Sequence, residues 1–391
     1  MSTKEENIRL KFLNIEQELN NFFIERDEPI HGLLVGLLSK TNLLFLGSPG
    51  TAKSMLIKEM AKHVVSVKYF EWLLTRFSTP DELFGPISAK GLKEDHYTRI
   101  VDGKLPEAHF VFLDEIFKAN SGILNCLLPL TNERIFYNDG KAVFIPLLCL
   151  VGASNEIPDE DEGLGALYDR FSLKYQIKPI VEETNFLKML ELVDSEPQTT
   201  ISIEELTFAQ RNVSEVEMSK GMYEMFSKIR NTLRKEGISV TDRTYKLATK
   251  IVRAEAWLDG CTKVGEAHLE LLKHLFWQNP DKIKIVQSHI LALTNPERNK
   301  VEEIYNCCLQ LVDDLEHLDT AEKRRSQGID AVAKLNTARK NIQTLIKTIT
   351  KKGKDPSKEK LKLTQVTTMV TDIANKHINM HIDLKQILDD E

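Results

Sequence analysis

The segment from Leu43 to Ser54 restricts the possible fold more than any other part of this chain. Four apolar residues, Leu43 to Leu46, lead into a turn that contains glycine and ends in Lys53 and Ser54. This order is typical of a buried strand, then a loop whose backbone N–H groups face an anion, then a helix whose positive dipole end points at the same anion. We therefore expect an α/β domain whose sheet begins here.

The turn has the composition of a phosphate-binding loop, which makes nucleotide binding the first hypothesis. In that interpretation Lys53 reaches the β and γ phosphates of ATP, and Ser54 is a ligand of Mg²⁺. The strict motif has glycine directly before the lysine, whereas this chain has Ala52, the smallest replacement. An ordinary strand-to-helix turn is the alternative. The candidate nucleotide-binding residues are Gly47, Ser48, Pro49, Gly50, Thr51, Ala52, Lys53 and Ser54.

A second apolar run, Phe110 to Leu113, ends in the acidic pair Asp114 and Glu115. A strand that is apolar at every position is buried on both faces, which favours a parallel sheet covered by helices. Ligands bind such sheets beyond the carboxyl ends of the strands, where the two acids emerge. We expect Asp114 to hold Mg²⁺ and Glu115 to orient the water that attacks the γ-phosphate. The alternative is a strand that ends in a solvated acidic turn.

Length and composition narrow the class of protein. A chain of 391 residues with 42% hydrophobic residues is long enough for two or three folded domains. The net charge of −6 gives no general reason to expect nucleic acid. The charged N-terminus has no apolar signal segment, and no apolar run approaches the roughly 20 residues of a membrane helix, so we expect a cytoplasmic protein without a membrane segment. The five cysteines show no Cys-x-x-Cys spacing and are expected to be reduced and mostly structural.

Patterning along the chain predicts three domains. Residues 1–180 alternate strand and helix patterns and form the α/β nucleotide-binding domain. Residues 181–294 are helical, include a helix start capped by Thr241, and form a smaller second domain. Residues 295–391 have only helical spacings, which predicts a C-terminal extension of helices packed as a hairpin or a bundle.

Two segments of the first domain read as insertions. Residues 88–103 mix glycine, polar residues and short apolar pairs, which indicates an inserted hairpin or loop. Residues 134–144 alternate around Asp139 and Gly140, a strong signal for a β-hairpin.

Charge is segregated in the C-terminal extension. Glu302 to Asp319 holds six acids and no Lys or Arg, whereas Glu322 to Lys362 holds thirteen bases against four acids. Packing of an acidic helix against a basic one explains this pattern, and docking of a partner protein is an alternative. Nucleic acid is the least favoured partner, because no aromatic residues interleave the basic stretch to stack on bases.

The order of these motifs resembles the MoxR family of AAA+ ATPases, and within it the subfamily called regulatory ATPase variant A. The resemblance covers residues 8–277, and the phosphate loop of this family commonly carries alanine before the lysine. Beyond the two nucleotide motifs it rests on the segments Arg76 to Pro86, Gly103 to Ala108, Phe112 to Ala119, Asn132 to Arg134, Ala153 to Glu156 and Ala166 to Phe171.

The resemblance implies an AAA+ P-loop core with a five-stranded parallel sheet, followed by a helical lid domain. The strand before Asn155 should lie between the phosphate-loop strand and the acidic strand. Asn155 would then position the attacking water, and Arg170 would be the arginine finger that enters the neighbouring subunit's site. Arg243 would be the sensor arginine with which the lid registers the γ-phosphate. The alternatives are a turn cap for Asn155, a helix end paired with Asp169 for Arg170, and a plain surface position for Arg243.

A finger supplied by a neighbour requires an oligomer, and the resemblance points to a hexameric ring. The implied activity is ATP hydrolysis that remodels or activates a partner protein complex, frequently one containing a von Willebrand factor A domain. In relatives the two insertions line or approach the central face of the ring. Arg76 and Glu133 are candidates for subunit contacts without an assigned role. The helical tail departs from relatives that carry a small β-rich module there, so partner binding by that module is not carried over.

Two other functions stay open at this level. One is a nucleic-acid-associated NTPase motor, and the other is a scaffold that binds nucleotide without cycling. The presence of Glu115, Asn155 and Arg170 argues against the scaffold, which has no physical need of them. No residue pattern in the sequence distinguishes ATP from GTP.

Overall fold

The computed structural model describes residues 2–156, 165–193, 196–351 and 356–378. Contacts divide the chain into two compact units, Met1–Val286 and Gln287–Glu391, which are described separately. None of the described helices is both long and apolar enough to cross a membrane.

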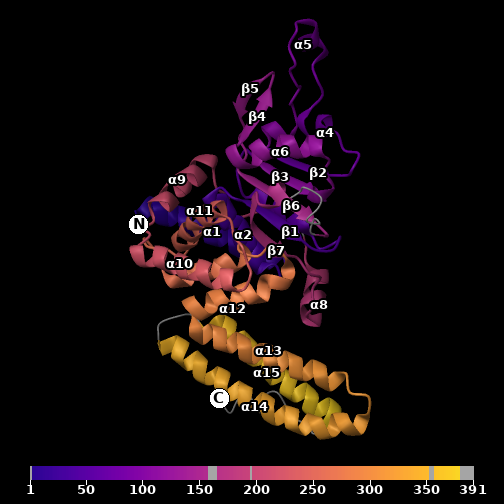
Figure 1. Cartoon of the computed structure of the whole chain (residues 1–391), viewed down its shortest axis with the longest axis vertical. Helices are drawn as coiled ribbons and strands as arrows, with labels where there is room; N and C mark the ends of the chain where they lie inside the picture. Colours follow the sequence, from indigo (N-terminus) through magenta and orange to yellow (C-terminus); the bar gives the residue numbers. More distant parts are fainter. Residues whose placement is uncertain (1, 157–164, 194–195, 352–355, 379–391) are drawn as a thin grey trace. The chain divides into compact units, whose positions relative to one another are not determined.

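A five-stranded sheet with the order β2-β3-β6-β1-β7 forms the centre of the first unit (Figure 1). All four strand pairs are parallel. β1 and β6 are buried at every position, as expected for strands covered by helices on both faces. β6 lies between β1 and β3, so the predicted place of the strand before Asn155 is confirmed. The strands are β1 (Asn42–Leu46), β2 (Tyr69–Leu73), β3 (Phe110–Asp114), β6 (Cys149–Ser154) and β7 (Phe171–Gln176).

Short-range chemistry explains where several helices of this unit begin. Ser2 and Thr79 each form a capping box with the glutamate three residues later, and Pro80 occupies the first turn after Thr79. The helices before and between the strands are α1 (Thr3–Phe22), α2 (Asp27–Ser39), α3 (Lys53–Lys62), α4 (Pro80–Phe84), α5 (Ala89–Lys93), α6 (Ser121–Glu133) and α7 (Gly165–Tyr168), with the 3₁₀ turns η1 (Leu105–Glu107) and η2 (Ile116–Lys118).

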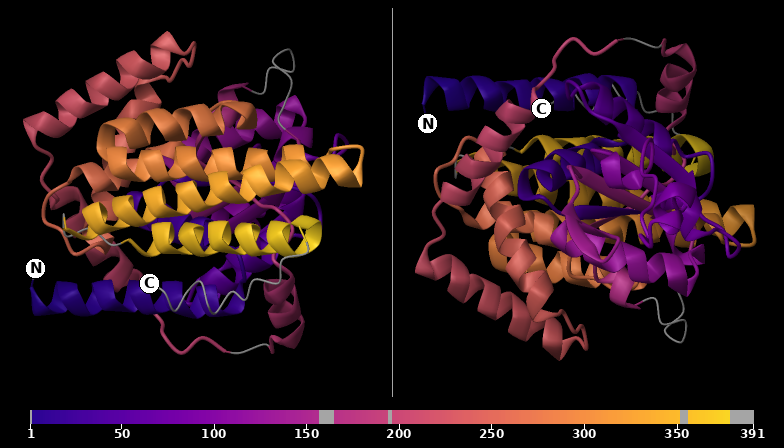
Figure 2. Two further views of the ribbon diagram at one scale, coloured as in Figure 1. Left: turned by 90° about the horizontal axis from the view of Figure 1, so that it is seen from below. Right: turned by 90° about the horizontal axis from the view of Figure 1, so that it is seen from above.

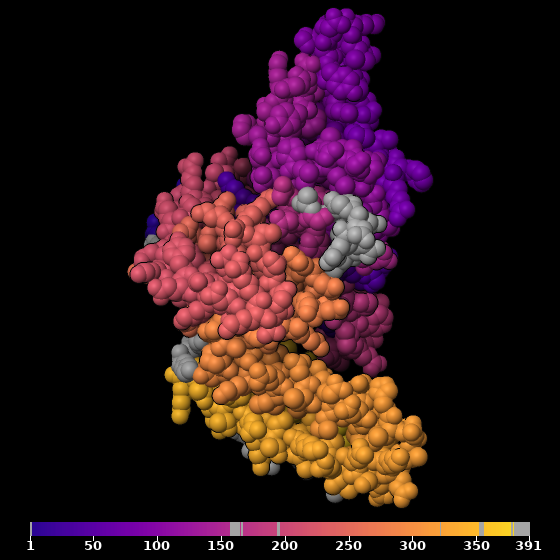
Figure 3. All heavy atoms as spheres, viewed as in Figure 1, coloured from indigo at the N-terminus to yellow at the C-terminus, as the bar shows by residue number. Residues whose placement is uncertain are grey.

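The two predicted insertions lie together in space. The hairpin is confirmed as β4 (Ile135–Asn138) paired antiparallel with β5 (Lys141–Phe144). Both turn residues, Asp139 and Gly140, have positive φ, as the favoured two-residue hairpin turn requires. The other insertion contains α5 and is closed by a bridge between Ile87 and Arg99. Both segments project from the sheet at one end of the unit (Figures 1 and 3).

Asn138 and Asp139 connect the two insertions. The Asp139 carboxylate accepts from the backbone N–H of Tyr97 at 2.7 Å and lies 3.0 Å from His96 Nδ1. The amide of Asn138 accepts from the backbone of Arg99 at 2.7 Å and donates back to it at 3.3 Å. These hydrogen bonds link the two insertions to each other.

The rest of the first unit is helical. It comprises α8 (Glu183–Glu191), α9 (Ile203–Glu215), α10 (Lys220–Lys235), α11 (Asp242–Leu258), the 3₁₀ segments η4 (Glu266–His274) and η5 (Pro280–Lys282), and the start of α12 (Ile283–Thr294). Thr241 caps α11 as predicted, accepting from the N–H of Thr244. α1 packs against α2 and also against α9 and α11, where Phe12 meets the buried Trp257 edge-on. The first helix therefore joins the sheet domain to the helical part.

The second unit contains three long helices that lie side by side (Figure 2). They are α13 (Pro296–Glu316), α14 (Ala321–Lys351) and α15 (Ser357–Ile373), followed by a π-helical turn, η6 (Ala374–Ile378). Their core includes Leu315, Leu335 and Val366. Acids of α13 pair with bases that follow α14 in the sequence: Glu302 with Lys362, and Glu316 with Lys376 at 2.9 Å. The residues from 379 to 391 of the predicted extension lie outside the described part of the chain.

Candidate functional site

The phosphate loop begins where β1 ends, held between its two neighbouring strands. The N–H of Gly47 donates to the carbonyl of Ser154 at 3.1 Å, and the N–H of Ile177 donates to the carbonyl of Leu46 at 2.7 Å. A Cβ on Gly47 would lie 2.0 Å from the Ile177 carbonyl oxygen. Only glycine fits at this position, because any side chain would push the loop away from β7.

Gly50 and Ala52 shape the loop through their backbone conformations. Both have positive φ, 77° and 63° respectively. Among the described residues, the N–H groups of Gly50, Thr51 and Ala52 have no backbone acceptor. These donors sit directly before α3, whose N-terminus adds a partial positive charge. The loop therefore has the form of an anion cradle, and Ala52 adopts the conformation for which the strict motif has glycine.

Lys53 is buried beneath this loop. Its ammonium donates to the carbonyls of Gly47 at 2.6 Å and Ser48 at 2.9 Å. Burial lowers the pKa of Lys53, while the carboxylates of Asp114 and Glu115 act in the opposite direction. A buried cation of this kind gains from a nearby anion.

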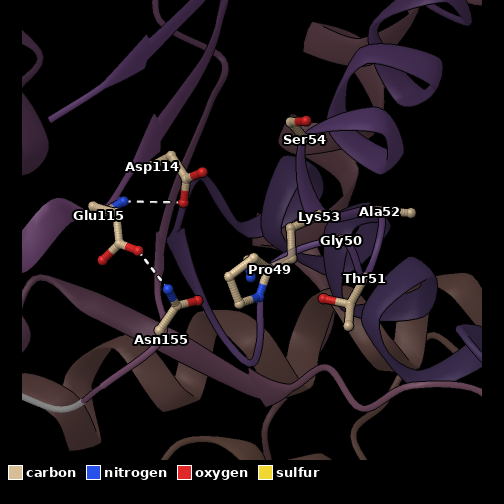
Figure 4. Close-up of a pocket in the computed structure, with 9 residues that line it drawn as sticks. All are labelled: Pro49, Gly50, Thr51, Ala52, Lys53, Ser54, Asp114, Glu115 and Asn155. Atoms are coloured by element: carbon tan, nitrogen blue, oxygen red, sulfur yellow. Dashed lines mark hydrogen bonds between the residues drawn. The ribbon is translucent and has the colours of Figure 1, made fainter.

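The predicted acidic residues meet the loop in one cavity of about 350 Å³. Asp114 and Glu115 reach it from the end of β3, and Asn155 reaches it from the end of β6 (Figure 4). The Nδ2 of Asn155 donates to Oε1 of Glu115 at 2.5 Å. The cavity is lined by Pro49, Gly50, Thr51, Ala52, Lys53, Ser54, Asp114, Glu115 and Asn155.

The lining residues fit a nucleotide with a bound divalent cation. The hydroxyl of Ser54 and the carboxylate of Asp114 are oxygen donors, which Mg²⁺ prefers, and both line the cavity. The unpaired loop N–H groups and Lys53 provide positive charge for phosphates on the same cavity wall.

Lys118 is one contact of this site that the sequence reasoning missed. Its ammonium lies 3.3 Å from Oε2 of Glu115, so Glu115 is held on one oxygen by Asn155 and on the other by Lys118. Lys118 follows Glu115 by three residues through η2, and this spacing is the signal that could have indicated the pair.

Arg170 is not part of this cavity. It directly precedes β7, which runs parallel to β1 with Phe171 opposite Asn42. Arg170 is therefore at the amino end of the strands, whereas the phosphate loop follows their carboxyl ends. The five residues of β1 separate the two ends by about 15 Å at roughly 3.3 Å per residue, farther than an arginine side chain extends.

Arg243 also lies at the amino end of the sheet. Its Nη2 donates to Oδ1 of Asn132 at 2.8 Å. Asn132 follows Thr131, whose carbonyl accepts from Nδ2 of Asn42 at the start of β1, at 2.9 Å. Asn132 belongs to one of the segments on which the family resemblance rests, but its bond to Arg243 depends on tertiary packing and has no local signal in the sequence.

Asp169 ties the segment before β7 to the start of α11. Its Oδ1 accepts from the hydroxyls of Thr241 at 3.3 Å and Thr244 at 3.4 Å. Within the described residues Arg170 forms no ion pair with Asp169, and its buried Nε has no hydrogen-bond partner. The alternative of a helix end paired with Asp169 is therefore not what the structure contains.

A second cavity of about 310 Å³ lies at the start of α2. Ile177, which lines it, is the residue whose carbonyl packs on Gly47, so this cavity adjoins the phosphate loop. Burial lowers the pKa of Arg26 at its edge, although Glu25 acts in the opposite direction. The lining residues are Glu25, Arg26, Asp27, Glu28, Pro29, Gln176 and Ile177.

Comparison with known families gives two matches, which together cover most of the first unit. The profile for the MoxR domain of the MoxR-vWA-beta-propeller ternary systems matches residues 10–212. The profile for the AAA lid domain matches residues 221–290.

Individual proteins and a solved structure are also similar to this chain. An uncharacterized protein of Methanocaldococcus jannaschii is 41% identical over 311 residues, which is 79% of this chain and 81% of that protein. Chaperone MoxR1 of Mycobacterium tuberculosis is 29% identical over 164 residues, 41% of this chain and 42% of that protein. A crystal structure of a candidate ATPase from Cytophaga hutchinsonii has a TM-score of 0.62 at 17% identity, and covers 75% of this chain and 96% of its own, so it shares the fold.

Proposed function

This chain belongs to the MoxR family of AAA ATPases, and from that premise we propose that it hydrolyses ATP in a head-to-tail ring to remodel or activate a partner protein complex. The observation that carries the ring is the separation of the proposed catalytic groups. Glu115 and Asn155 line the phosphate-loop cavity, whereas Arg170 and Arg243 lie at the opposite end of the strands.

In this proposal the residues of the cavity bind and position ATP. The loop N–H groups and Lys53 hold the phosphates, and Ser54 and Asp114 hold Mg²⁺. Mg²⁺, when bound, neutralises charge that develops on the phosphate oxygens. Glu115 and Asn155 orient the attacking water. The second cavity adjoins the loop through Ile177, and its lining residues would hold the base.

Arg170 and Arg243 act on the ATP of the next subunit. Neither lines the cavity of its own chain, and the length of β1 keeps Arg170 away from it. Arg170 directly follows Asp169, whose carboxylate accepts from Thr241 and Thr244 at the start of α11. Arg243, which also belongs to α11, donates to Asn132. We call the end of the sheet that carries Arg170 and Arg243 the arginine edge, and the end that carries the phosphate loop the phosphate-loop edge. A contact between the arginine edge of one copy and the phosphate-loop edge of the next is heterologous. Repetition of this contact closes a ring, for which we propose six subunits.

The partner is proposed to contain a von Willebrand factor A domain. The matching profile describes a MoxR domain that occurs with vWA and β-propeller proteins, and this supports the proposal. The narrower likeness to the regulatory ATPase variant A subfamily rests on the sequence motifs alone and is proposed on that basis.

Subunit mixing tests the division of the site between copies. Lys53→Ala removes the phosphate ligand but keeps Arg170, and Arg170→Ala removes the finger but keeps the cavity. Each variant alone should be nearly inactive, since a finger is typically worth about 10³ to 10⁵ in rate. An equimolar mixture should recover a substantial fraction of wild-type ATPase activity, because some interfaces then combine an intact cavity with an intact finger.

Both variants must assemble as the wild type does, which mass photometry on the same samples can verify. A mixture that assembles but stays inactive would overturn the shared site. Concentration-independent turnover by wild-type monomers would overturn the ring.

A further inference from the structure

We propose that the loop containing Arg76 and Phe77 docks on the arginine edge of the next copy, with Arg76 facing Glu133. This inference rests on the proposed ring and names the contact surfaces that close it.

The loop after β2 is a defined turn that presents an apolar side chain to solvent. The N–H of Thr75 donates to Oγ of Ser78 at 3.0 Å, and Phe77 N–H donates to Oγ1 of Thr75 at 3.2 Å. The carbonyl of Ser78 accepts from Nδ2 of Asn120 at 2.5 Å. Phe77 is 91% exposed, the most exposed large apolar side chain in the described part of the chain. Phe77 is therefore available for burial by a neighbouring copy, and aromatic side chains are enriched in the buried cores of protein–protein interfaces.

This loop lies at the phosphate-loop edge, where the carboxyl ends of the strands are. The N–H of Leu74 donates to the carbonyl of Asp114 at 2.9 Å, so the loop starts beside the acidic end of β3. Arg76 is exposed, and within the described residues it has no hydrogen bond or ion pair. An unpaired cation therefore stands next to Phe77 at the edge where the neighbour's Arg170 must arrive.

Glu133 lies at the arginine edge, at the opposite end of the strands from Arg76. It is the last residue of α6, it is exposed, and it too lacks an ion pair among the described residues. Two residues earlier, the carbonyl of Thr131 shares the side-chain amide of Asn42 with the carbonyl of Arg170, at 2.9 and 3.2 Å. The shared donor keeps the end of α6 beside Arg170.

The position of the Arg76 loop beside Asp114 and the position of Glu133 near Arg170 predict which segments face each other in the ring. When Arg170 approaches the Asp114 and Glu115 of the next copy, the end of α6 approaches the loop that starts beside Asp114. The opposite charges of Glu133 and Arg76 then face each other, and Phe77 is covered by the arriving edge. Charge complementarity at the rim of such a contact mainly sets register and specificity, and the phenylalanine adds buried apolar area.

Charge reversal in a background that holds ATP tests the contact. The parent is Glu115→Gln with ATP, and the readout is the protein concentration at half assembly, measured by sedimentation velocity. Arg76→Glu and Glu133→Arg should each raise that concentration about tenfold or more, and the double reversal should return it to within about threefold of the parent. Phe77→Ser should raise it as well. Arg325→Glu, an exposed reversal on α14, is the matched control and should leave assembly unchanged.

Two outcomes overturn the proposal in distinguishable ways. In the first outcome the parent forms rings, but the single reversals assemble as well as the parent does, or the double reversal assembles no better than the single variant that assembles less well. Either result rejects the Arg76–Glu133 contact and leaves the ring intact. A parent that stays monomeric with ATP at every concentration rejects the ring and this contact together.

Discussion

Asn155 and Glu115 are joined by a 2.5 Å hydrogen bond between side chains at the ends of the neighbouring strands β6 and β3. The amide thus holds the carboxylate that we propose orients the attacking water. Lys118 contacts the other carboxylate oxygen, so the direction of Glu115 is set from two sides. Glu115 itself has a φ of 53°, in the left-handed region, which fixes its backbone at the turn into η2.

Glu115→Gln should greatly slow turnover while preserving ATP binding, because the amide keeps the size of the side chain but loses the negative charge that orients and polarises the attacking water. We expect a loss of about 10² to 10⁴ in kcat, the range that is usual when a positioned acid–base group is removed. Single-turnover kinetics and filter binding of labelled ATP measure the two properties. Asn155→Ala should lower kcat less and leave ATP affinity within a few-fold. Ordinary turnover by Glu115→Gln would contradict the role.

Ala52 offers a test of the loop geometry. Ala52→Gly should retain ATP affinity and change the free energy of unfolding by less than about 1 kcal/mol, since relief of the left-handed conformation is opposed by greater freedom of glycine in the unfolded chain. Ala52→Val should weaken ATP binding tenfold or more, because a β-branched residue disfavours a φ of 63°. Titration with a fluorescent ATP analogue compares the three proteins. Equal affinity for all three would mean that the loop does not bind phosphate in this conformation.

His31 joins three helices through two carboxylates. Its Nδ1 lies 2.7 Å from Glu16 on α1, and its Nε2 lies 2.6 Å from Glu255 on α11. Burial alone lowers the pKa of His31, but the two carboxylates outweigh burial and raise it to about 10. A raised pKa in the folded state means that the stabilisation is complete below about pH 6.5 and is lost as the pH rises toward 10.

His31→Gln should therefore destabilise the first unit most at low pH. We expect a loss on the order of 3 kcal/mol at pH 6, after allowing for partial solvent exposure of the ring, and a much smaller loss near pH 10. Urea unfolding of both proteins at pH 6, 8 and 9.5 measures the difference. His96→Gln, at an exposed position of the first unit, is the control. A difference that does not depend on pH would show that His31 is not charged in the folded protein.

Lys174 should make the free energy of unfolding depend on pH in the direction opposite to that of His31. Its ammonium donates to the carbonyl of Trp277 at 2.7 Å and lies over the rings of Tyr168 and Trp277, in a buried position on β7. Burial lowers the pKa of Lys174 to about 7, while Asp169 acts in the opposite direction. Between pH 7 and 10.5 the unfolded chain binds more protons than the folded one, so this group makes stability rise with pH.

Lys174→Met removes that dependence. The free energy of unfolding of the variant, relative to wild type, should fall by on the order of 3 kcal/mol between pH 7 and pH 10. The absolute difference also includes the lost hydrogen bond to Trp277, so the informative quantity is the slope. Parallel stability curves for the two proteins would contradict a buried lysine with a lowered pKa.

Short-range patterns were sufficient for much of this protein. The phosphate loop, the apolar strand ending in Asp114, the hairpin turn at Asp139 and the cap at Thr241 each depend on a few consecutive residues whose backbone conformations and hydrogen bonds are local. The order of strands in the sheet was not read from such patterns and came from the likeness to a family. The segregation of charge in the C-terminal extension can be seen in the sequence. The pairing of Lys362 and Lys376 with acids of α13 cannot.

The sequence by itself determined which segments form strands, loops and helix starts, and it indicated which residues we propose for binding phosphate and Mg²⁺. Only the tertiary structure decided which of them meet. The parallel register of β1 and β7 puts Arg170 at the end of the sheet away from Lys53, and side-chain packing brings Arg243 to Asn132 and His31 to Glu255. These contacts join residues more than a hundred positions apart. They follow from sheet register and helix packing, which no local propensity encodes.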